Sequence, residues 1–184
     1  MSEPMTHGHE APTAWVQRWA CLIPAGGAVL DVACGAGRHL RWLAAQGHRV
    51  TGVDRDAQAV EPLRSLGEIV VADIENGPWP FEGRRFEAVV VTNYLWRPLL
   101  PTLIETIAPG GVLIYETFAL GHETVGRPRN PAFLLRPGEL LDAARPALRV
   151  VAYEDGWLEA PERFVQRLAA VRETGPQPAR HRLA

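Results

Sequence analysis

The sequence predicts an α/β protein with a doubly wound, mostly parallel sheet and helices on both of its faces. Short apolar segments bounded by Gly, Pro and Asp alternate with amphipathic stretches over most of the chain, as in repeated strand–helix units. Parallel strands need crossover connections, and these put helices on the faces of the sheet. A length of 184 residues with 47% hydrophobic residues is enough to form one core.

Each element is predicted from its own residues. Apolar runs between turn residues predict strands at 28–33, 49–53, 69–72, 86–92, 112–117, 148–153 and 164–171. Apolar residues at helical spacing predict helices at 14–22, 38–46, 56–66, 98–107 and 137–145. Pro62 lies inside the third helix, so a kink or two short turns are expected there. Gly and Pro predict a turn at 108–111.

We expect one domain over residues 12–175, with its N-terminal helix in residues 12–27, between disordered tails at 1–11 and 176–184. The loop at 118–136 is long for a compact domain, and such loops often act as lids. No apolar run approaches the ~20 residues that span a bilayer, and the first residues lack a signal-peptide pattern. A cytoplasmic location is therefore the default expectation.

Composition excludes several chemistries. All 19 basic residues are Arg, so there is no P-loop lysine and no Schiff-base lysine. The serines are Ser2 and Ser65, and neither lies in a G-x-S-x-G elbow. Cys21 and Cys34 are too few for a structural zinc cluster, and we expect no metal. A net charge of −2 gives no reason to expect a nucleic-acid partner.

The candidate site lies beyond the carboxyl ends of the strands, where such sheets bind ligands. The glycines of Cys34-Gly35-Ala36-Gly37 let the backbone approach a ligand at the start of a helix. The third glycine of the dinucleotide pattern would fall on Leu40, which argues against a nicotinamide oxidoreductase. Asp54 could accept both hydroxyls of a ribose, and Asp73 could accept from an adenine amine.

Residues 28–118 resemble the motif series of class I S-adenosylmethionine-dependent methyltransferases. The resemblance rests on VLDVACGAGRHLRWLAAQGHRVTGVD, VVADIENGPWPF, FEAVVVTNYLW and IAPGGVLIYETF. It implies a Rossmann-like seven-stranded sheet in the order 3-2-1-4-5-7-6, with one antiparallel strand. It also implies S-adenosylmethionine as cofactor and S-adenosylhomocysteine as its product.

The resemblance assigns roles to the residues at the strand ends. Asp31 would organise the glycine loop and hold the ligand amine, and Asn93 and Tyr94 would border the transferred methyl group. The full set expected to bind the cofactor is Asp31, Ala33, Gly35, Gly37, Arg38, Asp54, Arg55, Asp73, Ile74, Asn93 and Tyr94.

Methyl transfer from a sulfonium is an in-line displacement, in which the enzyme mainly aligns the reactants. For a nucleophile with a proton to lose, the candidate bases are Tyr94, Glu116, His122 and Glu123, and the sequence leaves open whether a base is used. We expect arginines of the long loop to pair with an anionic group of the substrate. These are Arg127, Arg129 and Arg136.

The expected acceptor is a small molecule, but alternatives stay open. GAGRH and FLLRPGELL are similar to tellurite-resistance methyltransferases, so a chalcogen-oxyanion acceptor is one alternative. A non-catalytic S-adenosylmethionine-binding module is another, and a nicotinamide oxidoreductase is the least favoured. Thr92-Asn93-Tyr94-Leu95 lacks the proline pair that stacks a flipped base, which argues against methylation of nucleic-acid bases. The sequence leaves the oligomeric state open.

Overall fold

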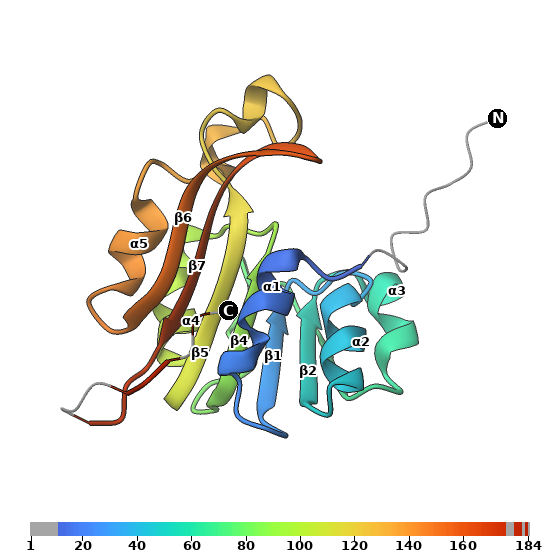
Figure 1. Cartoon of the computed structure of the whole chain (residues 1–184). Helices are drawn as coiled ribbons and strands as arrows, with labels where there is room; N and C mark the ends of the chain where they lie inside the picture. The colour runs from blue at the N-terminus through green and yellow to red at the C-terminus, as the bar shows by residue number, and fades with distance from the viewer. Residues whose placement is uncertain (1–10, 176–178, 182, 184) are drawn as a thin grey trace.

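A seven-stranded sheet runs through the computed structural model, which describes residues 11–175, 179–181 and 183. The strand order is β3-β2-β1-β4-β5-β7-β6 (Figure 1). Only β7 runs antiparallel, pairing with both β5 and β6. This confirms the predicted order and the single antiparallel strand. The strands are β1 (Ala28–Val32), β2 (Arg49–Asp54), β3 (Glu68–Val71), β4 (Phe86–Thr92), β5 (Ile107–Phe118), β6 (Arg149–Glu159) and β7 (Glu162–Val171).

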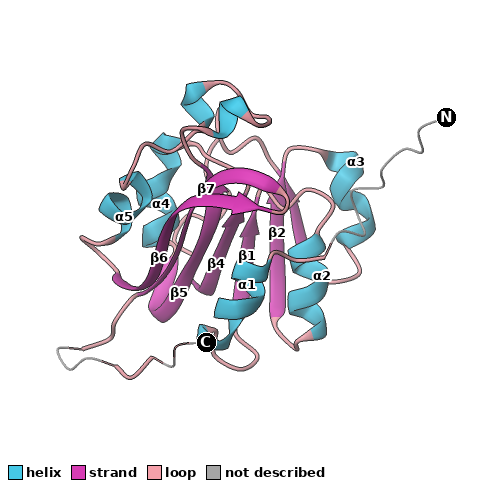
Figure 2. Ribbon diagram, turned by 45° about the horizontal axis from the view of Figure 1, so that its top comes forward, coloured by secondary structure: helices cyan, strands magenta, loops and turns pink. Residues whose placement is uncertain are grey.

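Helices cover both faces of the sheet (Figure 2). One face packs against α1 (Ala14–Trp19), α2 (Arg38–Ala45) and α3 (Ala57–Val60), and the other against α4 (Leu100–Glu105) and α5 (Glu139–Ala144). Neighbouring residues of β1 show the alternation, since Val29 is buried on the first side and Leu30 on the second. Short 3₁₀ helices at Ala20–Leu22, Glu61–Leu63, Arg97–Leu99, His122–Thr124 and Pro131–Phe133 complete the connections.

Two of the predicted elements are shaped by proline and glycine. The predicted 56–66 helix is split into α3 and a 3₁₀ helix that contains Pro62, as expected from the missing N–H. The turn predicted at 108–111 lies inside β5, which begins at Ile107 opposite Phe86; the next pair is Ala88 with Val112, so these residues form a bulge, with Gly110 at a φ of 78°. The backbone of β5 continues to pair beyond β7: Gly110 N donates to Arg172 O and Arg172 N donates to Gly111 O.

Two other predictions concern the ends of the chain and membrane-spanning helices. The expected tails at 1–11 and 176–184 lie largely outside the described residues, so their predicted disorder stays a prediction. None of the helices within the described part of the chain is long and apolar enough to cross a membrane.

Candidate active site

The loop between β1 and α2 turns through three residues with left-handed backbone. Ala33, Gly35 and Gly37 have φ values of 53°, 51° and 77°. Gly37 N donates to Cys34 O at 2.9 Å and closes the turn. A Cβ at Gly37 would lie 2.5 Å from the side chain of Leu63, so this position needs glycine for space as well as for φ.

Replacing Ala33 by glycine should stabilise the protein. A left-handed alanine costs about 1–2 kcal/mol, whereas glycine adds about 0.4–1 kcal/mol of unfolded-state entropy. Ala33→Gly should therefore raise the free energy of unfolding by about 0.5–1 kcal/mol in urea titrations. The control is Ala36→Gly in the same loop, where φ is not positive, and it should be destabilising. A lower free energy of unfolding for Ala33→Gly would show that the left-handed backbone of Ala33 is not strained.

Asp31 lies at the base of this loop as a buried carboxyl group, with only 1% of its surface exposed. Its Oδ2 has no hydrogen-bond partner among the described residues. Burial raises the pKa of Asp31 to about 8; Arg38 opposes this shift and Asp54 adds to it. The side chain is therefore mostly protonated at neutral pH and becomes a carboxylate readily when a cation approaches.

The carboxylates that follow β2 and β3 are both held by backbone amides. Asp54 Oδ2 accepts from Gly35 N at 2.8 Å, and Oδ1 accepts from Asp56 N at 2.9 Å. Asp73 accepts from the side chain of Asn76 and from two backbone amides, and these bonds lower its pKa. Asp54 thus connects the end of β2 directly to the glycine loop.

Three adjoining cavities open at the carboxyl ends of the strands. The carboxylate cavity has a volume of about 150 Å³ and is lined by Ala33, Asp54, Arg55, Ala72, Asp73, Ile74, Glu75 and Tyr94. The glycine-loop cavity, of about 220 Å³, is lined by residues 33–39 and 92–94. The aromatic cavity, of about 290 Å³, is lined by Arg55, Glu75, Asn93, Tyr94, Leu95, Thr117, Phe118, Pro128 and Phe133. Tyr94 lines all three, and each pair of cavities shares at least one further residue, so the three adjoin one another around Tyr94.

The predicted cofactor residues converge on these cavities. All of them except Asp31 line the carboxylate cavity or the glycine-loop cavity. Asn93 has a left-handed backbone, with φ of 54°, and its N–H donates to Glu116 O at 2.9 Å. Burial, reinforced by Glu75, raises the pKa of Tyr94, so its hydroxyl stays protonated at neutral pH.

His122 lies outside the three cavities. Its Nε2 is 2.9 Å from Arg127 O, and because a carbonyl only accepts, Nε2 carries the proton. Its ring stacks on Phe118 with centroids 4.3 Å apart, and Gly126 packs against it. These contacts give His122 a role in ordering the loop after β5.

Glu116 also lies outside the cavities, on the face of the sheet that α1 covers. Its side chain is 1% exposed and pairs with Arg163 at 3.2 Å and Arg167 at 3.5 Å, both from β7. Arg167 in turn lies 4.8 Å from the ring of Trp15. The structure therefore places Glu116 in a buried charge cluster beneath α1.

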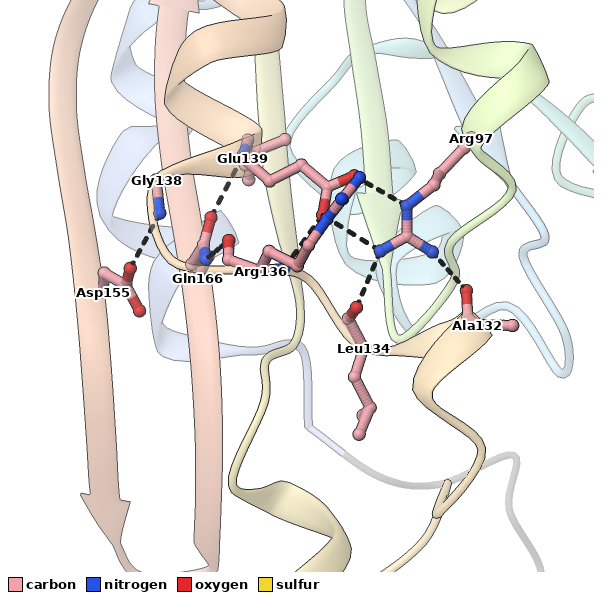
Figure 3. Close-up of polar contacts among 9 residues, drawn as sticks. Arg97, Ala132, Leu134, Arg136, Gly138, Glu139, Asp155 and Gln166 are labelled. Carbon is pink, nitrogen blue, oxygen red and sulfur yellow. Dashed lines mark hydrogen bonds and ion pairs between the residues drawn. The ribbon is translucent and has the colours of Figure 1, made fainter.

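The three loop arginines do not line the aromatic cavity. Arg127 and Arg129 are exposed, and Arg136 lies 3.6 Å from Glu139. The arginine that holds this loop is Arg97, which donates to both carboxylate oxygens of Glu139 at 2.6 and 2.9 Å (Figure 3). The Arg97 side chain also donates to the backbone carbonyls of Ala132 and Leu134. It thereby anchors the second half of the expected lid, residues 131–136.

Removing Arg97 should release this anchor. Arg97→Met should lower the free energy of unfolding by about 2–3 kcal/mol at pH 7, because two carbonyls lose their donor and the partly buried Glu139 carboxylate keeps only its contacts with Arg136. Arg97, with a smaller contribution from the hydrogen bonds of Arg136, lowers the pKa of Glu139 from 4.5 to about 2, so the stabilisation is present above pH 4.5 and is lost as the pH falls towards 2.

The matched control is Arg145→Met, which removes an exposed pair with Asp142 and should change stability by less than about 0.5 kcal/mol. Denaturant titrations of the two variants side by side check the prediction. Equal effects of the two substitutions would contradict it.

Four of the lining residues that sequence reasoning missed show what it can and cannot detect. Glu75 and Thr117 lie next to strand ends, where their position was a usable signal, and Phe133 comes from the far loop with no local signal. The fourth is His39 of α2, which is buried; its Nε2 accepts from Thr13 N at 3.2 Å. Burial lowers the pKa of His39 to about 3, so its ring is neutral.

The residues present fit S-adenosylmethionine. Asp31 offers an unpaired buried carboxyl oxygen to an ammonium group, and the glycine loop leaves room above its backbone, since a Cβ at Gly35 would meet nothing within 4 Å. Asp54 and Asp73 face the carboxylate cavity together. Within the described residues, no cluster of three His, Cys, Asp or Glu side chains could hold a metal ion.

Residues 29–111 match the family model described as a methyltransferase domain. No curated protein matches the chain in sequence. A TehB-like SAM-dependent methyltransferase from Corynebacterium glutamicum has a TM-score of 0.61 and 19% identity, covering 86% of this chain and 87% of that one. TehB from Haemophilus influenzae has a TM-score of 0.66 and 20% identity, with 84% and 60% covered. The glycopeptide N-methyltransferase MtfA, complexed with S-adenosylhomocysteine, has a TM-score of 0.62 and 17% identity, with 89% and 91% covered.

The fold is that of class I S-adenosylmethionine-dependent methyltransferases, as the structural similarities show. The residues that match the methyltransferase domain model include the glycine loop, Asp54 and Asp73. The comparisons thus show this fold for the described part of the chain and a match to a methyltransferase domain over residues 29–111.

Proposed function

We propose that the chain transfers a methyl group from S-adenosylmethionine to a small-molecule acceptor in the aromatic cavity. The observation that carries this proposal is the meeting of three cavities at Tyr94. A cofactor that occupies the carboxylate and glycine-loop cavities and an acceptor in the aromatic cavity would then touch beside Tyr94 and Asn93. Each reactant enters from its own side, as a displacement in line requires.

Each part of the cofactor has proposed partners. Asp31 and the loop from Ala33 to Gly37, with Arg38, bind the amino-acid part. Asp54 accepts from the ribose hydroxyls, and Arg55 borders the same cavity. Asp73 and Ile74 bind the adenine through the carboxylate and the backbone.

When bound, S-adenosylmethionine supplies a methyl group on a positively charged sulfur. In that reaction a heteroatom of the acceptor would bond to the methyl carbon as the methyl–sulfur bond breaks, the electron pair would stay on sulfur, and the acceptor proton would pass to bulk solvent. The residues around the junction align the two ligands and exclude water, and alignment of this kind contributes up to about 7–11 kcal/mol. Of the candidate bases, Tyr94 alone borders the junction, where its protonated hydroxyl positions the acceptor.

Thermal unfolding with ligands tests the proposal. At a hundred times its dissociation constant, S-adenosylhomocysteine should stabilise the fold by about 2.7 kcal/mol, whereas NAD should give no shift. Transfer of labelled methyl from S-adenosylmethionine to a panel of thiols, phenols, acids and oxyanions then separates an enzyme from a binding module. A shift with NAD and none with S-adenosylhomocysteine would overturn the proposal in favour of an oxidoreductase.

A second candidate acceptor is a chalcogen oxyanion. It is supported by the similarity to TehB and to the TehB-like structure. This candidate needs cationic side chains at the acceptor, and the loop arginines would have to move towards the aromatic cavity to provide them. Methyl transfer to tellurite, lost in Arg127→Ala, Arg129→Ala or Arg136→Ala, would establish it.

A further inference from the structure

The aromatic cavity has walls that favour an apolar ligand. Its lining includes Phe118, Phe133, Leu95 and Pro128, and Phe133 is 40% exposed at its mouth. An apolar cavity of about 150 Å³ is enough to hold benzene. The volume of about 290 Å³ therefore leaves room for one or two fused rings.

The charges around this cavity balance each other. Arg55 and Glu75 are the charged side chains among its lining residues, and both also border the carboxylate cavity. A multiply charged oxyanion would lose hydrogen bonds to water on entering this cavity, and no set of arginine side chains in its lining would replace them. The cavity therefore selects against an anionic acceptor.

Thr117 supplies one polar contact inside the apolar wall. The residue is 1% exposed, and its Oγ1 has no hydrogen-bond partner among the described residues. A buried hydroxyl without a partner is costly, and it can both donate and accept. Because Thr117 lines the cavity, a heteroatom of a bound ligand is the partner that would supply the missing hydrogen bond of its Oγ1.

We infer that the acceptor is an uncharged aromatic molecule of one or two rings that carries a hydroxyl or thiol group, and that Thr117 Oγ1 hydrogen-bonds this group. The inference rests on the proposed function, because it assigns the acceptor of the same reaction. Phe118 and Phe133 bind the rings, and Thr117 directs the nucleophilic heteroatom towards the junction at Tyr94.

Calorimetric titration of the protein, free and loaded with S-adenosylhomocysteine, tests this inference. The probes are 2-naphthol, the equally sized but charged 2-naphthoate, and tellurite. We expect 2-naphthol to bind at least about tenfold more tightly than 2-naphthoate, and tellurite to give no heat. Equal or tighter binding of either anion would overturn the inference.

Two variants separate the contacts. Thr117→Val keeps the shape and the strand preference of the side chain, and should weaken 2-naphthol binding about three- to tenfold while leaving S-adenosylhomocysteine affinity unchanged. Thr174→Val, the same exchange at an exposed threonine outside the three cavities, is the matched control and should leave both affinities unchanged. An unchanged affinity for 2-naphthol in Thr117→Val would refute the role of Thr117.

The two proposals fail in different ways. Absence of heat with S-adenosylhomocysteine overturns the proposed function, whereas titration of the free protein still measures 2-naphthol binding. Normal S-adenosylhomocysteine binding without 2-naphthol binding overturns the acceptor alone.

Discussion

Asp54→Ala should weaken the binding of S-adenosylhomocysteine by at least about 100-fold, because it removes two kinds of contact at once. The carboxylate holds the glycine loop through Gly35 N, and in the proposed complex it also accepts from the ribose hydroxyls. Hydrogen bonds to a charged group contribute about 1.5–3 kcal/mol each, so the loss of two accounts for this factor. Titration calorimetry of the wild type and the variant measures it.

The control for this substitution is Asp56→Ala, two residues away. Asp56 caps α3 by accepting from Gln58 N and Ala59 N, and it lines none of the three cavities. Its loss should cost about 1 kcal/mol of stability and leave the affinity for S-adenosylhomocysteine unchanged. If Asp54→Ala bound as tightly as Asp56→Ala, the ribose role of Asp54 would be wrong.

The second large effect concerns the proton on Asp31. Its pKa is about 8 in the folded protein against an ordinary value of 3.8, so between these pH values the folded state holds a proton that the unfolded state has lost. The contribution of Asp31 to the free energy of unfolding is therefore complete below pH 3.8. It decreases as the pH rises towards 8, by at most about 1.4 kcal/mol per pH unit. Asp31→Asn should remove this slope in denaturant titrations from pH 5 to 8. Parallel pH profiles for wild type and variant would show that Asp31 is already ionised.

The same proton links Asp31 to the ligand. An ammonium group beside the carboxyl favours its charged form, so S-adenosylhomocysteine binding at pH 7 should release a proton. Calorimetry in two buffers with different ionisation enthalpies measures this release, and Asp31→Asn should abolish it. A cofactor amine that lies elsewhere would leave the two buffers indistinguishable.

Local patterns were enough to predict the sheet and the convergence of the expected cofactor residues. Most of these residues lie at or just beyond the carboxyl end of a parallel strand, and because parallel strands end at the same edge, Asp54, Asp73 and Tyr94 come together without further information. The turn chemistry of the glycine loop is likewise local. One subtle feature is the left-handed Ala33, whose φ no propensity rule predicts.

Contacts across the fold were beyond the sequence. Glu116 follows the pattern of a strand-end acid, but β7 brings Arg163 and Arg167 against it from about 50 residues further along the chain. Arg97 and Glu139 are 42 positions apart, and no motif connects them. Glu116 and His122 are directed away from the cavities by such pairings, which depend on how β7 and the loop pack.

A crystal structure of the complex with S-adenosylhomocysteine tests the central claim most directly. Our account predicts adenine beside Asp73 and Ile74, ribose hydroxyls within hydrogen-bond distance of Asp54, and a sulfur atom that faces Asn93 and Tyr94 at the entrance to the aromatic cavity. A ligand bound away from Asp54 and Asp73, or with its sulfur turned away from that cavity, would contradict it.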